Sequence, residues 1–220
     1  KMSNKIFILF YETNKLINKC IFYVFIFFIG RKYFRGDKPV KVFITGLPRS
    51  GTSFIAGLLV KLGYSPGPIS WLKKGDINNK YGYYECLPVF HEITKIKNKI
   101  SNNFYYDPPK FSISWMKNCK SNLKKIRIFF KKGGIQVYKD TRLVILGDLF
   151  EKMYPDAKWI IIKRDVNDTF NSHFGDTIEY KEHQIITETQ LNYWNNSKVS
   201  KKALVLNYDD FKNNLKKDFD

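Results

Sequence analysis

A glycine-rich turn between a buried strand and a helix constrains this chain more than any other feature. Residues 40–45 (VKVFIT) are apolar and rich in β-branched side chains, as is typical of a buried strand. After the turn at 46–53 (GLPRSGTS), apolar side chains recur at helical spacing until Gly63, namely Phe54, Ile55, Leu58, Leu59 and Leu62. A strand, a tight turn and a helix in this order predict the first unit of an α/β fold.

The turn has the features of an anion-binding site. It matches the phosphate-loop pattern GxxxxGK[ST], except that Thr52 stands where Lys is usual. Glycines allow successive backbone N–H groups and the positive end of the next helix to converge on one phosphate-like group. The guanidinium of Arg49 supplies a planar, permanently charged partner for an oxyanion. We therefore predict an anion site formed by Arg49, Ser50, Gly51, Thr52 and Ser53.

Strand and helix signals alternate through the rest of the chain. Further strands are predicted at 135–138, 159–163 and 203–206, and further helices at 89–100, 113–130, 143–153, 168–174, 182–195 and 208–217. Residues 65–84, rich in Gly, Pro and aromatic side chains, are predicted to form a long loop. This alternation predicts a doubly wound parallel sheet flanked by helices, with its site at the carboxyl ends of the strands.

Arg164 and Ser172 follow the strand predicted at 159–163. The end of that strand places Arg164 on the same sheet edge as the 46–53 turn, and the next helix carries Ser172. Two anion-binding elements on one edge predict a ligand with two phosphate-like ends. An ordinary ion pair of Arg164 with Asp165 or Asp168 is the competing interpretation, and the sequence leaves both open.

Taken together, these residues resemble the sulfotransferases that use 3′-phosphoadenosine 5′-phosphosulfate (PAPS). The segment GLPRSGTSF is similar to their PRSGT loop, which holds the 5′-phosphosulfate, and Arg164 with Ser172 matches their RDxxDxxxS element, which holds the 3′-phosphate. Lys139-Asp140 is similar to a segment near the transferred group, residues 81–85 (YGYYE) resemble the GYxE stretch of bacterial members, and residues 208–211 (YDDF) resemble their YEDL.

The resemblance implies a P-loop-like sulfotransferase fold and metal-free transfer of a sulfuryl group from PAPS to an acceptor hydroxyl or amine. Arg49 and Lys139 are then the expected cations at the departing phosphate. Glu85 is the expected general base, as in the tyrosylprotein and bacterial branches, and Asp140 is the alternative. The chain departs from the pattern in having Val166 where Pro is usual and no His within 139–143.

Purely structural roles for these residues stay open as alternatives to the catalytic ones. Glu85 could complement the dipole of the following helix, and Lys139 could be a solvated lysine at a strand end. We expect the acceptor group to belong to a glycan, a lipid or a small molecule. The aromatic residues within 65–132 could stack on a carbohydrate acceptor, although packing in the core explains such residues equally well.

Two other classes of protein compete with the sulfotransferase. A phosphate-loop kinase of a nucleotide or sugar would need a loop Lys and a magnesium-binding Asp at a strand end. A basic nucleic-acid-binding protein would fit the charge, but no RRM, KH or zinc-finger signature is present, and we expect no nucleic-acid partner.

Charge, cysteine and histidine usage narrow the remaining classes. The 220 residues include 38 Lys and Arg against 20 Asp and Glu, a net charge of +18. Such a charge favours polyanionic partners. A compositional bias toward Lys, Asn and Ile would give the same basic surface without any specific partner. Cys20, Cys86 and Cys119 form no CxxC pair, which argues against a disulfide framework and a structural zinc site and favours a reducing compartment. The three histidines form no HExxH motif, which argues against a catalytic zinc site.

Residues 1–37 are predicted to be an extension that precedes a sulfotransferase domain at 38–220. The apolar run 20–29 has 10 residues, whereas a spanning helix needs about 20. Its basic flanks suit either a helix docked on the domain or peripheral membrane contact through residues 5–35. We expect a cytoplasmic location, with membrane association under the second interpretation, and a domain truncated at its C-terminus if the chain is a fragment.

Overall fold

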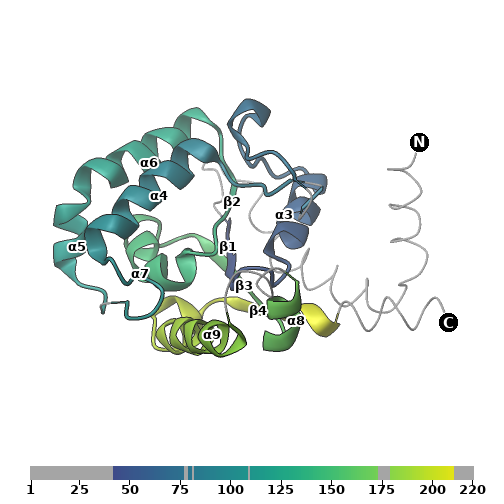
Figure 1. Ribbon diagram of the computed structural model, residues 1–220. Helices are drawn as coiled ribbons and strands as arrows, with labels where there is room; N and C mark the ends of the chain where they lie inside the picture. The colour runs from purple at the N-terminus through teal and green to yellow at the C-terminus, as the bar shows by residue number, and fades with distance from the viewer. Residues whose placement is uncertain (1–41, 77–78, 81, 109, 173–178, 211–220) are drawn as a thin grey trace, which may run out of the picture. The chain divides into compact units, whose positions relative to one another are not determined.

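A four-stranded parallel sheet organises the part of the chain that the computed structural model describes, residues 42–76, 79–80, 82–108, 110–172 and 179–210. The strands are β1 (Val42–Gly46), β2 (Val137–Lys139), β3 (Lys158–Lys163) and β4 (Leu204–Asn207). Their order across the sheet is β2-β1-β3-β4, and each neighbouring pair is parallel (Figure 1). The predicted α/β class, with a parallel sheet flanked by helices, is confirmed.

Helices connect the strands in the order that the sequence pattern predicts. Between β1 and β2 lie α3 (Thr52–Lys61), the short 3-10 turn η2 (Ile69–Trp71), α4 (Leu87–Ile100), α5 (Ile113–Asn118) and α6 (Lys120–Lys132). Between β2 and β3 lies α7 (Leu143–Met153). Between β3 and β4 lie α8 (Val166–Asn171), α9 (Tyr180–Asn195) and the 3-10 turn η3 (Val199–Lys201).

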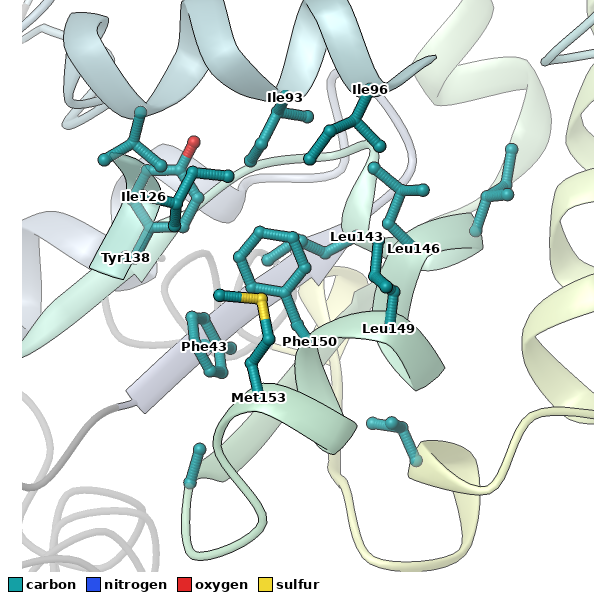
Figure 2. Packing of buried hydrophobic residues seen from close by; sticks show 14 of the residues in the cluster. Phe43, Ile93, Ile96, Ile126, Tyr138, Leu143, Leu146, Leu149, Phe150 and Met153 are labelled. Atoms are coloured by element: carbon teal, nitrogen blue, oxygen red, sulfur yellow. The ribbon is translucent and has the colours of Figure 1, made fainter. Parts of the chain in front are cut away.

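The two faces of the sheet are covered by different helices. Alternate strand residues Phe43, Tyr138, Trp159 and Ile161 join the main apolar cluster with side chains of α4, α6 and α7. Figure 2 shows Phe43 beside Phe150 and Met153 of α7, and the rings of Phe43 and Phe150 lie 5.5 Å apart, edge to face. The intervening strand residues point to the other face, and α3 packs against β1 and β2 on the side opposite α4, α6 and α7 (Figure 1).

Most predicted elements differ from the observed ones only by one or two residues at their ends, but two helices differ in a way that has a structural cause. The helix predicted at 113–130 is broken at Cys119, where the backbone leaves helical geometry (φ −101°, ψ 7°). This bend allows Trp115 of α5 and Leu123 of α6 both to reach the core. The helix predicted at 168–174 instead begins at Val166, because the Asp165 carboxylate accepts the N–H groups of Asn167 and Asp168 as an N-cap.

Several predictions concern residues outside the described ranges. They are the N-terminal extension at 1–37 with its membrane contact at 5–35, most of the helix predicted at 208–217, and the end of the helix predicted at 168–174. Within the described ranges, no helix combines the length and the apolar character needed to cross a bilayer.

Candidate functional site

The strand order places a topological switch point between β1 and β3. β2 lies on one side of β1 and β3 lies on the other. The connection that follows β1 therefore runs in one direction across the sheet, to β2, and the connection that follows β3 runs in the opposite direction, to β4. Ligands of open α/β sheets bind at such switch points, outside the carboxyl ends of the strands. Gly46 ends β1 in register with Ile162 of β3, so the 46–53 turn and Arg164 emerge side by side.

The turn contains two residues in the left-handed region just before α3. Gly51, the N-cap of α3, has φ +91°, and Arg49 has φ +65°, which is uncommon for a residue with a side chain. A Cβ on Gly46 would lie 2.4 Å from the Ile162 carbonyl oxygen, so only glycine permits this approach of β1 to β3. The turn therefore delivers the N-terminus of α3, with its unsatisfied N–H groups, to the switch point.

The three hydroxyls that the sequence assigns to the turn differ in placement. Ser50 is fully buried and donates to the Leu47 carbonyl oxygen at 2.7 Å, so its proton braces the turn. Thr52 begins α3 and is 4% exposed, whereas Ser53 is half-buried. Ser50 therefore uses its hydroxyl proton inside the loop, whereas Thr52 and Ser53 lie at the first positions of α3.

The two predicted anion-binding elements meet in one cluster. Arg49 Nε donates to Ser172 Oγ at 3.1 Å, and Arg164 Nη1 donates to the Arg49 carbonyl oxygen at 2.8 Å. The competing ion pair is also present but long, since Arg164 Nη2 lies 3.5 Å from the Asp168 carboxylate. Both elements therefore lie at the switch point, and Arg164 contacts the loop backbone as well as Asp168.

Arg164 carries one donor with no hydrogen-bond partner within the described residues. Its Nε is buried, although the whole side chain keeps 16% of its surface exposed. A buried unpaired donor is costly unless a ligand or water satisfies it. The Tyr208 ring, whose centroid lies 5.0 Å from the Arg164 guanidinium carbon, covers the group on one side. The sequence places Tyr208 just after a strand, but its contact with Arg164 was not predicted.

A second charged group, formed by Glu85 and Lys139, lies at the end of β2. Lys139 Nζ and Glu85 Oε1 are 2.5 Å apart, and the two residues are 3% and 7% exposed. Lys139 is therefore not a solvated strand-end lysine. Tyr84, which precedes Glu85, has φ +54°, and its ring packs so closely on Gly57 of α3 that a Cβ there would lie 3.1 Å from it. Backbone strain of this kind clusters at functional sites.

Tyr83 lies beside Lys139 of this pair. Its ring centroid lies 5.8 Å from Lys139 Nζ and 3.9 Å from Lys73 Nζ, and its hydroxyl donates to both carboxylate oxygens of Asp76, at 2.7 and 2.8 Å. Burial, followed by the bond to Asp76, raises the pKa of Tyr83 to about 12, with Arg49 opposing and Glu85 adding to the shift. Tyr83 therefore lies beside Lys139 of the pair, and the charges of Arg49 and Glu85 act on its pKa in opposite directions.

Asp140 has a different environment from that of Glu85. Its two oxygens accept four hydrogen bonds: the N–H, Nε and Nη2 of Arg142, at 2.9, 2.8 and 2.5 Å, and the Tyr138 hydroxyl, at 2.9 Å. Burial favours its neutral form, but Arg142 and these hydrogen bonds outweigh burial and hold the pKa of Asp140 below its ordinary value. A carboxylate this engaged is a poor proton acceptor. It anchors Arg142, whose Nη1 donates to Thr94 of α4 at 2.7 Å.

The sequence analysis did not predict the buried role of Arg142. It is 5% exposed, and its guanidinium stacks on the Phe90 ring at 3.9 Å and joins α4 to the end of β2. Its position two residues after Asp140 was the only available signal, and nothing in the pattern separates an internal partner from a surface arginine. Within the described residues, no group of three or more Asp, Glu, His or Cys side chains is arranged to hold a metal ion.

Comparison with known proteins adds no family to this geometry. No protein-family model matches the chain, and no curated protein matches it either.

Proposed function

We propose that the chain is a sulfotransferase that moves a sulfuryl group from PAPS to an acceptor hydroxyl or amine. One observation carries the proposal: the 46–53 turn, Arg164 and Ser172 meet at the β1–β3 switch point, and the buried Lys139–Glu85 pair lies at the end of the neighbouring strand β2. The convergence on one sheet edge follows from the strand pattern, but the direct contacts of Arg49 with Ser172 and of Arg164 with the loop backbone add to the motif resemblance, because motif spacing does not fix side-chain contacts.

The chain offers partners for both ends of a bisphosphate. The N-terminus of α3, Thr52 and Ser53 suit the 5′-phosphosulfate, because backbone N–H groups and hydroxyls donate there to a multiply charged oxyanion. Ser172 and the unpaired Nε of Arg164 suit the 3′-phosphate. The Arg49 side chain lies between the two sets, where its contact with Ser172 can be exchanged for contacts with phosphate oxygens.

The Lys139–Glu85 pair suits the transfer step. The S–O bond to the phosphate breaks, and a new S–O bond to an acceptor hydroxyl or a new S–N bond to an acceptor amine forms. The electrons of the broken bond leave with the bridging oxygen. Lys139 and Arg49 stabilise the charge that develops on that oxygen. Glu85 accepts the acceptor proton. The buried contact of Glu85 with Lys139 holds both groups in fixed positions at one strand end.

Glu85 suits the role of general base better than Asp140 does. Within the described residues, the Glu85 carboxylate accepts one hydrogen bond, from Lys139 to Oε1, whereas both oxygens of Asp140 are engaged by Arg142 and Tyr138. Asp140 suits a positioning role. It binds Arg142, and Arg142 in turn donates to Thr94 of α4, the helix that begins just after Glu85.

The test is transfer of labelled sulfate from PAPS by the full chain to a panel of glycans, lipids, phenols and peptides, in buffer with a metal chelator. The proposal expects at least one acceptor to be labelled and adenosine 3′,5′-bisphosphate to inhibit the reaction. Binding of the bisphosphate without transfer to any acceptor would restrict the site to donor binding. A parallel assay with magnesium and ATP labelled on its γ-phosphate is the comparison: transfer of labelled phosphate there, with no sulfate transfer from PAPS, would assign the loop to phosphoryl transfer.

A further inference from the structure

A fully exposed isoleucine stands on a rigid turn outside the candidate site. Ile69 of η2 is 90% exposed. Its turn is closed by hydrogen bonds from the Trp71 N–H to the Pro68 carbonyl at 2.9 Å and from the Leu72 N–H to the Ile69 carbonyl at 3.1 Å. The Trp71 ring packs edge to face on Phe129 of α6, 5.9 Å between centroids. The fold therefore holds an aliphatic side chain in water on a fixed support.

The helix beside this turn has a cationic outer face. Lys124, Ile128, Lys131 and Lys132 recur at i, i+4, i+7 and i+8, so they share one side of α6, and all four are exposed, Ile128 by 40%. The opposite side of α6, with Leu123, Ile126 and Phe130, is buried in the core. We call Ile69 and these four residues the η2–α6 face.

Acidic residues are absent from the two segments that build this face. Residues 51–75 and 110–139 contain no Asp or Glu. The nearest carboxylate facing α6 from α4 is Glu92, which is 5% exposed, accepts hydrogen bonds from Lys95 and Asn122, and lies 3.9 Å from Lys125. The positive charge of the η2–α6 face is therefore directed to the solvent.

We propose that the η2–α6 face binds the surface of a bilayer that contains anionic phospholipid. Lysines near such a surface each contribute about 1 kcal/mol of attraction, and exposed aliphatic side chains among them can enter the boundary between headgroups and acyl chains. RNA and sulfated glycans also attract lysines, but single-stranded nucleic acid uses aromatic stacking, and neither offers an apolar phase for Ile69 and Ile128. The combination of aliphatic and cationic side chains favours lipid.

The test is co-sedimentation of the full chain with vesicles of phosphatidylcholine, with and without phosphatidylserine. The expected result is binding that requires phosphatidylserine and weakens as salt is added. The double variant Lys131→Gln/Lys132→Gln should lower the vesicle affinity about tenfold or more. Ile69→Ser, which keeps every charge, should lower it about tenfold as well.

Matched controls separate this face from general charge and from the candidate site. Lys198→Gln/Lys201→Gln removes the same charge from exposed positions around η3 and should bind vesicles like the parent chain. None of these variants should change the affinity for adenosine 3′,5′-bisphosphate, so the lipid proposal can fail while the donor site stands. The proposal is overturned if the η2–α6 variants and the η3 variant bind vesicles equally. It is also overturned if the face binds RNA with an affinity that Ile69→Ser leaves unchanged and does not bind vesicles.

Discussion

Lys139 Nζ lies 2.5 Å from Glu85 Oε1 in a buried ion pair that joins the last residue of β2 to the residue two positions before α4. These residues are 54 positions apart in the sequence. The pair brings a cation and a carboxylate to the sheet edge that also carries the 46–53 turn, and the proposed chemistry depends on both.

Glu85→Gln is expected to lower the rate of sulfate transfer by at least about a hundredfold, because a general base contributes typically that much or more. Binding of adenosine 3′,5′-bisphosphate should stay nearly unchanged, since Glu85 itself is not among the proposed partners of its phosphates. Single-turnover transfer and calorimetric titration measure the two quantities. Glu179→Gln, at an exposed position before α9, is the matched control and should behave like the parent chain.

Near-normal transfer by Glu85→Gln, together with loss of transfer in Asp140→Asn at unchanged donor affinity, would pass the role of base to Asp140. Because Glu85 and Lys139 are in contact, their substitutions should be non-additive. The double variant Glu85→Gln/Lys139→Gln should therefore cost less than the sum of the single effects.

Asp140→Asn is expected to destabilise the fold by about 3–5 kcal/mol, because it leaves the buried Arg142 charge without its carboxylate. Urea unfolding followed by circular dichroism measures this loss. The exposed Asp156→Asn is the control and should stay within about 0.5 kcal/mol of the parent chain. Replacing both partners, as in Asp140→Leu/Arg142→Met, should recover much of the loss. Parent-like stability of Asp140→Asn would contradict the anchoring role.

Gly51→Ala is expected to be more destabilising than Gly63→Ala, although both positions have nearly the same backbone, φ +91° and φ +94°. A Cβ on Gly51 would lie 2.2 Å from the Tyr208 ring, whereas a Cβ on Gly63 meets nothing within 4 Å. The difference between their free energies of unfolding therefore isolates the collision with Tyr208. Equal losses would show that Tyr208 does not pack on the loop.

Arg164→Ala is expected to weaken PAPS binding more than tenfold, because a charge-assisted hydrogen bond to an oxyanion contributes about 1.5–3 kcal/mol. Adenosine 5′-phosphosulfate, which lacks the 3′-phosphate, should be affected less. Some loss with both ligands is expected, since Arg164 also donates to the Arg49 carbonyl oxygen of the loop. Arg49→Ala should weaken both donors as well. Equal losses of the two donors in Arg164→Ala would refute its assignment to the 3′ end.

Local patterns were enough to predict the sheet and the placement of its loops. Continuous apolar runs identified β1 and β3, and parallel strands bring their ends to one edge, so Arg49, Arg164 and Ser172 were expected together. The direct bonds of Arg49 to Ser172 and of Arg164 to the loop were not predictable, because they depend on side-chain directions. The break at Cys119 was missed for a similar reason. The apolar periodicity shows which residues face the core, but it does not show that the helix bends so that both halves reach that core.

The most direct measurement is calorimetric titration of the full chain with adenosine 3′,5′-bisphosphate in the presence of a metal chelator. A sulfotransferase site predicts saturable binding of one bisphosphate per chain that needs no magnesium and weakens more than tenfold in Arg164→Ala. The contrary result is no binding of the bisphosphate and saturable, magnesium-dependent binding of ATP at the same loop. That result would replace sulfuryl transfer with phosphoryl transfer.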